Sequence, residues 1–365
     1  MPVVQTLMRL LALCLLLANG GPSDYACASE PKRAAPAAQV FLETHTAMGT
    51  IFSIYLSAST EREAHTVAQS AFDEVDRVDE LLSNYRPSSE LSRINREAAL
   101  GPIVTDRETF AFVATSIGWS ARTNGAFDIT VGRLMKAWGF FRANGHVPSA
   151  AELAEAGRQV GWQKVILNSQ ERSVRFAADN VELDPGGIGK GYVVDRMVEM
   201  LRVEHVTSAL ISAGSSTIYA IGAPPGRRGW KVQIPDPEDH QRPISTVILR
   251  DTSLSTSACT EKYFVLDGHR YCHIMNPHTL KPVEDMVQTT AIHPSATASD
   301  ALSASLFVLG PEASVRLLKG MPEASALLLA GHGRVEHCTS VRWSDPEGGD
   351  VCRRTATKRN RKVEP

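Results

Sequence analysis

The segment LDPGGIGKGYVVDR, residues 183–196, constrains the fold more than any other part of the chain. Glycines and a lysine stand between a strand-like run and a helix-like repeat, as in loops that bind nucleotides. A Walker loop does not fit, because it needs a glycine and a Ser or Thr where this chain has Asp184 and Gly191. A dinucleotide fingerprint does not fit either, since its third glycine would fall on Tyr192.

Two interpretations of this loop remain. Small residues let backbone N–H groups approach an anion, and the positive end of the following helix dipole and Lys190 would add to the attraction. Alternatively, residues 186–191 only form a tight turn between a strand and a helix.

An apolar face follows the loop and predicts a helix. It consists of Val193, Val194, Met197, Val198 and Leu201. Asp195 and Arg196 then fall on the solvent side. Other helices are expected at about 61–82 and 106–123, and strands at FSIYL (52–56), VILN, VRFA, ALISA and WKVQI. This irregular alternation favours an α+β fold with antiparallel strands over a doubly wound parallel sheet.

Composition narrows the class of partner. The chain has 365 residues, 43% hydrophobic and 21% charged, which suits one large or two ordinary globular domains. Its net charge of -2 and pI near 6.6 give no electrostatic reason to expect nucleic acid. We expect a small molecule or another protein as the partner.

The N-terminus has the features of an export signal. Arg9 precedes an apolar run at 10–18 that is too short to span a bilayer, and Ala26-Cys27-Ala28 fits cleavage after Ala28. Lipid attachment at Cys27 is the alternative. We therefore expect an exported protein of the periplasm or cell envelope, and no later segment reads as membrane-spanning. The expected organisation is a signal peptide (1–28), a linker (29–39), one domain (40–345) and a disordered basic tail (346–365).

Four cysteines fall in the part of the chain beyond the signal. Cys338 and Cys352 flank a turn-rich segment and could form a disulfide in an oxidising compartment. Cys259 and Cys272 flank an expected Asp-Gly hairpin turn, which sets Cys272 opposite Tyr263, so we expect these two to be unpaired. Neither pair has the C-x-x-C spacing of a zinc site.

Three further segments carry residues suited to chemistry. In NGAFDITVGRLMKAWGF (124–140), Asp128 lies between apolar neighbours and must be a structural hydrogen-bond hub or a ligand contact, while Trp138 and Phe140 offer flat surface. In HIMNPHTLKP, His273 ends a strand before an Asn-Pro turn, where it could face a cleft or be structural. In SDALSASLFVLG, Asp300 begins a predicted helix as a helix-dipole partner or a magnesium ligand.

A series of segments, in order, resembles the ApbE family of FAD:protein FMN transferases over about residues 40–345. They are TAMGTIFSIYL, LSNYRPSSELSRIN, GAFDITVGRLMKAWGF, ELDPGGIGKGYVVD, SAGSSTIYAIG followed by GWKVQI, STSACTEKYF, HIMNP and SDALSASLFVLG. The resemblance implies a two-layer α/β domain that binds FAD. It also implies Mg²⁺-dependent transfer of FMN to a threonine of an acceptor protein, with release of AMP.

The same resemblance assigns roles to residues of this chain. Cofactor contacts would come from Met48, Tyr85, Ala126, Phe127, Asp128, Asp184, Lys190 and Ile274. Mg²⁺ would bind the backbone oxygen of Gly187 and the carboxylate of Asp300, with Ala304 nearby. Lys190 would stabilise phosphoryl charge, and His273 is the candidate general base.

This chain departs from the family pattern at several positions. Ala304 stands where many members have Thr, Ala258 and Cys259 where they have Gly-Asp, Asn276 where they have Asp, and Leu280 where they have Gly. The first departure concerns metal affinity and the others the side that faces the acceptor. The acceptor would be an exported or membrane redox subunit. Alternative functions are an FAD pyrophosphatase that yields FMN and AMP, and a non-catalytic FAD-binding envelope protein.

Overall fold

The computed structural model describes residues 39–142, 144–260, 262–346 and 349–353. The predicted signal peptide with Cys27, residues 29–38 of the predicted linker and residues 354–365 of the predicted tail lie outside the described residues. Gln39, the last residue of the predicted linker, is the first residue of a strand.

The centre of the domain is an eight-stranded sheet in the order β1-β2-β6-β7-β10-β15-β16-β17. Every neighbouring pair in it is antiparallel. The strands are β1 (Gln39–Ala47), β2 (Thr50–Ala58), β6 (Ser208–Ala213), β7 (Thr217–Gly222), β10 (Thr252–Ala258), β15 (Met286–His293), β16 (Ser325–Ala330) and β17 (His337–Val341). The predicted α+β class with antiparallel strands is therefore confirmed.

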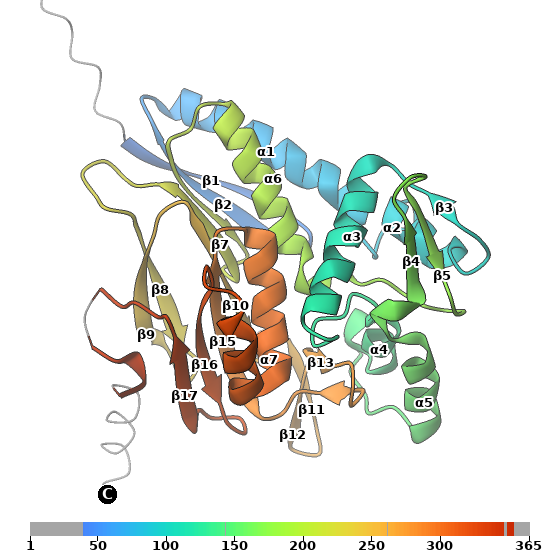
Figure 1. Cartoon of the computed structure of the whole chain (residues 1–365). Helices are drawn as coiled ribbons and strands as arrows, with labels where there is room; N and C mark the ends of the chain where they lie inside the picture. Colours follow the sequence, from blue (N-terminus) through green and yellow to red (C-terminus); the bar gives the residue numbers. More distant parts are fainter. Residues whose placement is uncertain (1–38, 143, 261, 347–348, 354–365) are drawn as a thin grey trace, which may run out of the picture. The chain divides into compact units, whose positions relative to one another are not determined.

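Three helices cover one face of this sheet (Figure 1). They are α1 (Glu61–Leu82), α6 (Gly189–Val203) and α7 (Ala296–Lys319). α1 packs on β1 and β2, α6 lies between α1 and α7, and α7 packs on β10 and β15. In β2 the side chains of Phe52, Ile54 and Leu56 are buried while Ile51 and Tyr55 are exposed, which is the period-2 alternation of a strand that buries one face.

The opposite face of the sheet is partly covered by the hairpin of β8 (Trp230–Asp236) and β9 (Asp239–Leu249). Trp230, Val232 and Val247 of this hairpin share an apolar cluster with Leu254 of β10 and Leu329 of β16. The sheet therefore has a core on both faces, and the larger core lies under the helices.

By length and composition α7 could cross a membrane, and it is the one such helix among the described residues. The sequence did not predict this property. In the structure α7 is a core helix, packed against α6, β10 and β15. Gly310 breaks its helical geometry with φ +70°, directly before Pro311.

A smaller region carries the remaining helices and short sheets. Its helices are α2 (Glu90–Glu97), α3 (Arg107–Arg122), α4 (Gly132–Ala137) and α5 (Ala150–Gln159), with 3₁₀ turns at Phe140–Arg142, Trp162–Lys164 and Pro185–Gly187. Its strands are β3 (Ile103–Val104), β4 (Val165–Asn168), β5 (Ser173–Phe176), β11 (Tyr263–Leu266), β12 (His269–Cys272), β13 (Met275–Asn276) and β14 (Lys281–Pro282). The Asp-Gly turn joins β11 to β12 as predicted.

The prediction that Trp138 and Phe140 supply flat surface is wrong. Trp138 is 3% exposed, and its indole N–H donates to the Leu280 carbonyl at 3.0 Å. The Phe140 ring packs on Phe264, with 5.3 Å between ring centroids. Both belong to a small core between α4, α5 and the β11–β12 hairpin, because the chain turns back there and covers them.

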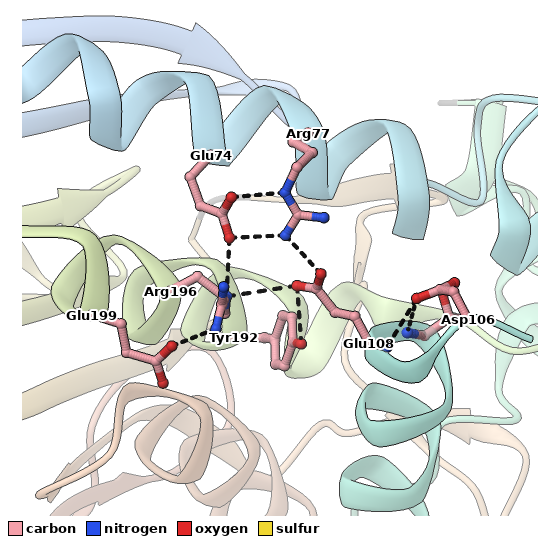
Figure 2. A network of polar contacts seen from close by, with 8 residues as sticks. Glu74, Arg77, Asp106, Glu108, Tyr192, Arg196 and Glu199 are labelled. Carbon is pink, nitrogen blue, oxygen red and sulfur yellow. Dashed lines mark hydrogen bonds and ion pairs between the residues drawn. The ribbon is translucent and has the colours of Figure 1, made fainter. Parts of the chain in front are cut away.

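A network of charged side chains joins α1, α3 and α6 (Figure 2). The Glu74 carboxylate, 8% exposed, accepts hydrogen bonds from Arg77 at 2.7 and 2.8 Å and from Arg196 at 2.9 Å. Glu108 of α3 accepts from Arg77 at 2.6 Å and from the Tyr192 hydroxyl at 3.2 Å. The network holds α6, and with it the loop before α6, against two other helices.

The prediction that Asp195 and Arg196 lie on the solvent side of their helix is therefore wrong. Arg196 joins the network of Figure 2. Asp195 accepts from the backbone N–H groups of Ala296 at 2.7 Å and Thr297 at 2.9 Å, and from the hydroxyl of Ser295 at 2.7 Å. Asp195 faces the start of α7 and Arg196 faces α1 and α3, so both side chains lie at contacts between helices and are only partly exposed.

Both cysteine pairs of the domain form disulfides. The Cys338–Cys352 bond is confirmed, and Val351 beside it is buried in the second core. The Cys259–Cys272 bond contradicts the expectation that these residues are unpaired. The predicted register, with Tyr263 opposite Cys272, is correct. This register does not prevent the bond, because Cys259 precedes the hairpin and reaches Cys272 from outside it.

Candidate functional site

The glycine-rich loop is held beside the NGAFDITVG segment by backbone contacts. The N–H of Asp184 donates to the Ile129 carbonyl at 2.7 Å, and the N–H of Gly132 donates to the Glu182 carbonyl at 3.1 Å. Val131 and Glu182 form an isolated parallel bridge. Two segments that are some fifty residues apart in the sequence thus form one surface.

The glycines of the loop have different reasons to be glycine. A Cβ on Gly191 would lie 2.2 Å from the Ala296 carbonyl oxygen, so this glycine is required by the close contact of α6 with α7. A Cβ on Gly187 would lie 3.3 Å from the Phe127 ring and 3.6 Å from Cβ of Ala304. Gly191 thus has a packing role inside α6, whereas Gly187 lies at the surface that Phe127 and Ala304 share.

Met48 reaches this loop from the tip of the first hairpin. Met48 and Gly49 have φ values of +51° and +70°, and they form the two-residue turn between β1 and β2. The Met48 methyl group lies 3.8 Å from the position that a Cβ on Gly189 would take. The turn thus places Met48 against the start of α6.

Lys190 and Asp300 are the charged pair of the site. The Lys190 ammonium donates to the Ser216 hydroxyl. The Asp300 carboxylate accepts from the Gly191 N–H at 2.9 Å and from the Thr217 hydroxyl at 3.3 Å. Burial raises the pKa of Asp300, and the positive charge of Lys190 acts against this shift.

Asp300 does not lie in the first turn of its helix, contrary to the sequence prediction. α7 begins at Ala296 with Ser295 as its N-cap. Asp300 therefore lies in the second turn and is 7% exposed, too deep for the role of a first-turn dipole partner. Ala304 follows one helical turn later, next to Gly187.

His273 is held in one tautomer by the protein. Its Nδ1 lies 2.9 Å from the Lys262 carbonyl oxygen, and its backbone N–H donates to the same oxygen at 3.1 Å. Because a carbonyl only accepts, Nδ1 carries the proton and Nε2 keeps its lone pair. Burial lowers the pKa of His273 to about 4, helped by the charges of Lys262 and Lys190. The ring is neutral at pH 7 and can accept a proton at Nε2. Ile274, the next residue, packs on the main core.

Asp128 is a hydrogen-bond hub, one of the two roles proposed for it. It accepts from the Thr130 N–H at 2.9 Å, the Thr130 hydroxyl at 2.7 Å and the Trp162 N–H at 2.9 Å. Burial raises its pKa, and the hydrogen bonds from Thr130 oppose this shift. Ala126 and Phe127 are buried beside it.

Tyr85 is the exposed aromatic residue of the site. Its side chain is 63% exposed, and its ring stacks on Phe141 with 4.5 Å between centroids and 7° between planes. A cavity of about 260 Å³ adjoins this stack, lined by Lys136, Gly139, Phe141 and Asn144. A planar ligand that stacks on Tyr85 must use the ring face that Phe141 does not cover, or displace Phe141. Phe141 was not among the residues predicted from the sequence.

Two buried donors near these residues have no hydrogen-bond partner among the described residues. They are Nε1 of Trp162 and Nδ2 of Asn84. Burial raises the pKa of the Asp184 carboxyl, and Asn84 acts against this shift although its Nδ2 lies beyond normal hydrogen-bond distance of any acceptor in the described part of the chain. Asn84 precedes Tyr85, and Trp162 donates its backbone N–H to Asp128. Buried donors without partners are costly, so their presence fits a site that receives a polar ligand such as FAD. The sequence analysis missed both, although Asn84 lies within LSNYRPSSELSRIN.

The described residues contain no cluster of three His, Cys, Asp or Glu side chains that could hold a metal ion. Asp300 offers one carboxylate and the Gly187 backbone one carbonyl oxygen. The methyl side chain of Ala304 offers no ligand. Mg²⁺ commonly binds through one or two carboxylates together with waters and substrate phosphates. These residues therefore fit Mg²⁺ that shares its coordination with a bound phosphate.

A larger cavity lies elsewhere in the domain. It has a volume of about 950 Å³ and is lined by residues at the kink of α7 and along β16 and β17, among them Gly310, His332 and Cys338. None of the predicted site residues lines it. Volume alone therefore does not identify the candidate site, which rests on the convergence of charged and polar groups around the loop.

Known proteins resemble this chain over most of its length. The model of a family described as the ApbE family matches residues 48–328. The FAD:protein FMN transferase of Treponema pallidum is 32% identical over 76% of this chain and 81% of its own length. The FAD:protein FMN transferase of Salmonella typhimurium is 30% identical over 80% of this chain and 84% of its own length.

Solved structures share the fold. The ApbE protein of Thermotoga maritima superposes with a TM-score of 0.76 at 28% identity, covering 83% of this chain and 97% of that one. The flavinyl transferase ApbE of Pseudomonas stutzeri superposes with a TM-score of 0.74 at 26% identity, covering 84% and 96%. The predicted ApbE-like α+β fold is therefore confirmed.

Proposed function

We propose that this chain, which belongs to the ApbE family, transfers the FMN half of FAD to a threonine hydroxyl of an acceptor protein, with Mg²⁺, and releases AMP. The observation that carries the proposal is that Lys190 of the loop lies near enough for its charge to act on both the buried carboxylate of Asp300 and the neutral ring of His273. Lys190 and Asp300 suit the phosphates of FAD, and His273 suits the incoming hydroxyl.

The proposed step is a substitution at phosphorus. The threonine oxygen forms a bond to the phosphorus of the FMN phosphate, and the bond from that phosphorus to the bridging oxygen breaks. AMP leaves with the bridging oxygen. Nε2 of His273 accepts the hydroxyl proton, since Nδ1 already carries one. Nothing is oxidised or reduced.

The residues of this chain bind and orient the reacting groups. Phosphoryl transfer depends mainly on positioning and on electrostatic stabilisation of the phosphoryl oxygens. Lys190 supplies a full positive charge, and the start of α6 adds the positive end of its dipole. Phe127 lies beside Gly187 and Met48 beside Gly189, and both side chains restrict where the phosphates can lie. Mg²⁺ held at Asp300 and the Gly187 carbonyl would supply Lewis-acid stabilisation.

Ala304 bears directly on this proposal. It lies next to Gly187 and carries no oxygen, so water must take the place of a threonine hydroxyl in the coordination of Mg²⁺. Mg²⁺ retains waters readily, and the loss of one protein ligand is compatible with activity.

We further propose that the protein acts outside the cytoplasm. The two disulfides support this, because such bonds persist in oxidising compartments. The export signal expected at 1–28, with lipid attachment at Cys27 as the alternative, is consistent with it. The acceptor would then be another exported or membrane protein, such as a redox subunit.

The test uses the full chain with FAD, Mg²⁺ and a threonine-bearing acceptor, and an acceptor with that threonine changed to valine as the control. Protein-linked flavin and AMP in equal amounts, on the threonine acceptor only, are the expected result. Free FMN with AMP and no linked flavin would identify an FAD pyrophosphatase. FAD binding without AMP would identify a non-catalytic flavin-binding protein.

A further inference from the structure

The Cys259–Cys272 disulfide joins two sheets that are hydrogen-bonded separately. Cys259 directly follows β10 of the eight-stranded sheet, and its N–H donates to the Val287 carbonyl of β15 at 3.4 Å. Cys272 is the last residue of β12 in the small hairpin and is 3% exposed. The bond thus anchors the hairpin to the main sheet.

His273 depends on the segment that this disulfide closes. It directly follows Cys272, and the carbonyl that holds its Nδ1 belongs to Lys262, which lies between Cys259 and the hairpin. Tyr263, next to Lys262, pairs across the hairpin with Cys272. His273 therefore directly follows one cysteine of the disulfide, and Lys262, whose carbonyl orients the ring, lies three residues after the other.

We propose that the Cys259–Cys272 disulfide positions His273 for the transfer reaction, so that the protein is fully active only when this bond is formed. This inference rests on the proposed function. A dithiol would cleave the bond by a two-electron reduction that yields two thiols, and would itself be oxidised to a disulfide. Lys262 would then be tied to the main sheet through the backbone alone, and His273 would lose its fixed tautomer and direction.

The chain contains a second disulfide with which this one can be compared. The second disulfide, Cys338–Cys352, has a similar sequence separation, 14 against 13 residues, but it lines the larger cavity. The chain therefore contains its own matched control, because both bonds close loops of similar length and only one adjoins His273.

The first experiment compares the double variants C259S/C272S and C338S/C352S in the full chain. We expect FMN transfer by the first to fall about 10²-fold in kcat, the scale of a misplaced reacting group, with the KM for FAD unchanged. The second should keep the wild-type kcat. Equal kcat values for both variants and the wild type would overturn the proposal.

A second measurement does not need the reaction. The imidazole of His273 is titrated by NMR without FAD, and its signal is assigned by its loss in His273→Asn. The charged groups that act on this ring are Lys262 and Lys190, and its pKa with the bond formed is about 4. In C259S/C272S the pKa should rise toward the ordinary 6.5, because the ring gains solvent. An unchanged pKa would contradict the proposed role of the disulfide, whether or not the wild type transfers FMN. Absence of FMN transfer by the wild type would count only against the proposed function.

Loss of folding in C259S/C272S is addressed by reducing the C338S/C352S protein with dithiothreitol. Cys259–Cys272 is then the disulfide that remains among the described residues. We expect the transfer rate to fall on reduction and to return on reoxidation, with an unchanged circular dichroism spectrum. A rate that falls only together with the helical signal would show that the bond holds the fold and does not position His273.

Discussion

At the scale of single residues, the site combines groups whose charges are set by burial. Asp300 is buried beside Lys190, and its raised pKa means that the ionised form is less favourable here than in water. His273 has the opposite shift and is neutral at pH 7. Such displaced pKa values are common where a protein binds charge or transfers protons.

Asp300→Asn should abolish Mg²⁺-dependent AMP release while FAD binding remains. An amide oxygen can still accept from Gly191 N–H, and its NH₂ can donate to Thr217, so the packing is retained. Because the folded-state pKa is raised, the carboxylate costs stability above that pKa, and the variant should melt no lower than the wild type at pH 7. AMP release and the melting temperature are measured together. Undiminished AMP release would exclude Asp300 from the metal site.

His273→Asn should lower transfer by about 10²- to 10⁴-fold, the usual range for a general base. The pH dependence of the wild type gives the sharper test. A base accepts protons only when neutral, and the pKa of His273 is about 4 rather than 6.5. The acidic limb of kcat/KM against pH, which reports groups of the free protein, should therefore fall near 4 and be absent from the residual activity of the variant. A limb near 6.5 would assign the base to another group.

At the scale of elements, the start of α6 is placed by its contact with α7. Gly191 lets the two helices approach, Asp300 of α7 accepts its N–H, and Asp195 of α6 caps the N-terminus of α7. Each helix thus supplies a hydrogen-bonding partner to the end of the other. This arrangement brings the glycine-rich loop and the predicted metal ligand together.

Gly191→Ala should therefore lower both stability and activity. Its Cβ would lie 2.2 Å from a backbone oxygen of Ala296, so one helix must shift, and overpacking of this kind costs about 1–3 kcal/mol. Gly118→Ala in α3 is the matched control, because nothing lies within 4 Å of its added Cβ. That variant should gain up to about 1 kcal/mol from helix propensity. The melting temperatures and transfer rates of both variants are measured. A Gly191 variant as stable as the control would show that α6 and α7 are not in close contact at this position.

At the scale of the whole molecule, the network around Glu74 joins three helices that are far apart in the sequence (Figure 2). Hydrogen bonds from Arg77, more than any other cause, hold the pKa of Glu74 below its ordinary value of 4.5. A lowered pKa contributes stability that is fully present above the unfolded-state value. That contribution is lost as the pH falls below 4.5 and through the folded-state pKa.

Glu74→Gln should thus destabilise the protein by about 1–3 kcal/mol at pH 7, the range for hydrogen bonds to charged groups. The difference from the wild type should shrink as the pH falls below 4.5. Glu155→Gln removes the exposed ion pair with Arg158, while its amide oxygen can still accept from Gln159, so it serves as the control with an expected change near zero. Calorimetric melts across this pH range test the expectation. A difference that is independent of pH would show that the charge of Glu74 does not carry the effect.

The sequence by itself determined the elements whose signals are local. The helix at 61–82, the alternating strand around Phe52 and the Asp-Gly hairpin follow from periodicity and turn chemistry within a few residues. It also located the segments of the candidate site, because those segments carry a recognisable order of residue types. The charge of Lys190 acts on Asp300, and Gly187 lies beside Ala304, one helical turn after Asp300.

Only the tertiary structure decided which groups meet across those segments. The Cys259–Cys272 bond, the cap that Asp195 provides and the second-turn position of Asp300 depend on how loops and helices pack, which no local period encodes. Partners of this kind are selected by long-range contacts and by the requirement that buried polar groups be satisfied. The same side chain is solvated or buried according to what packs against it, and that is settled when the whole chain folds.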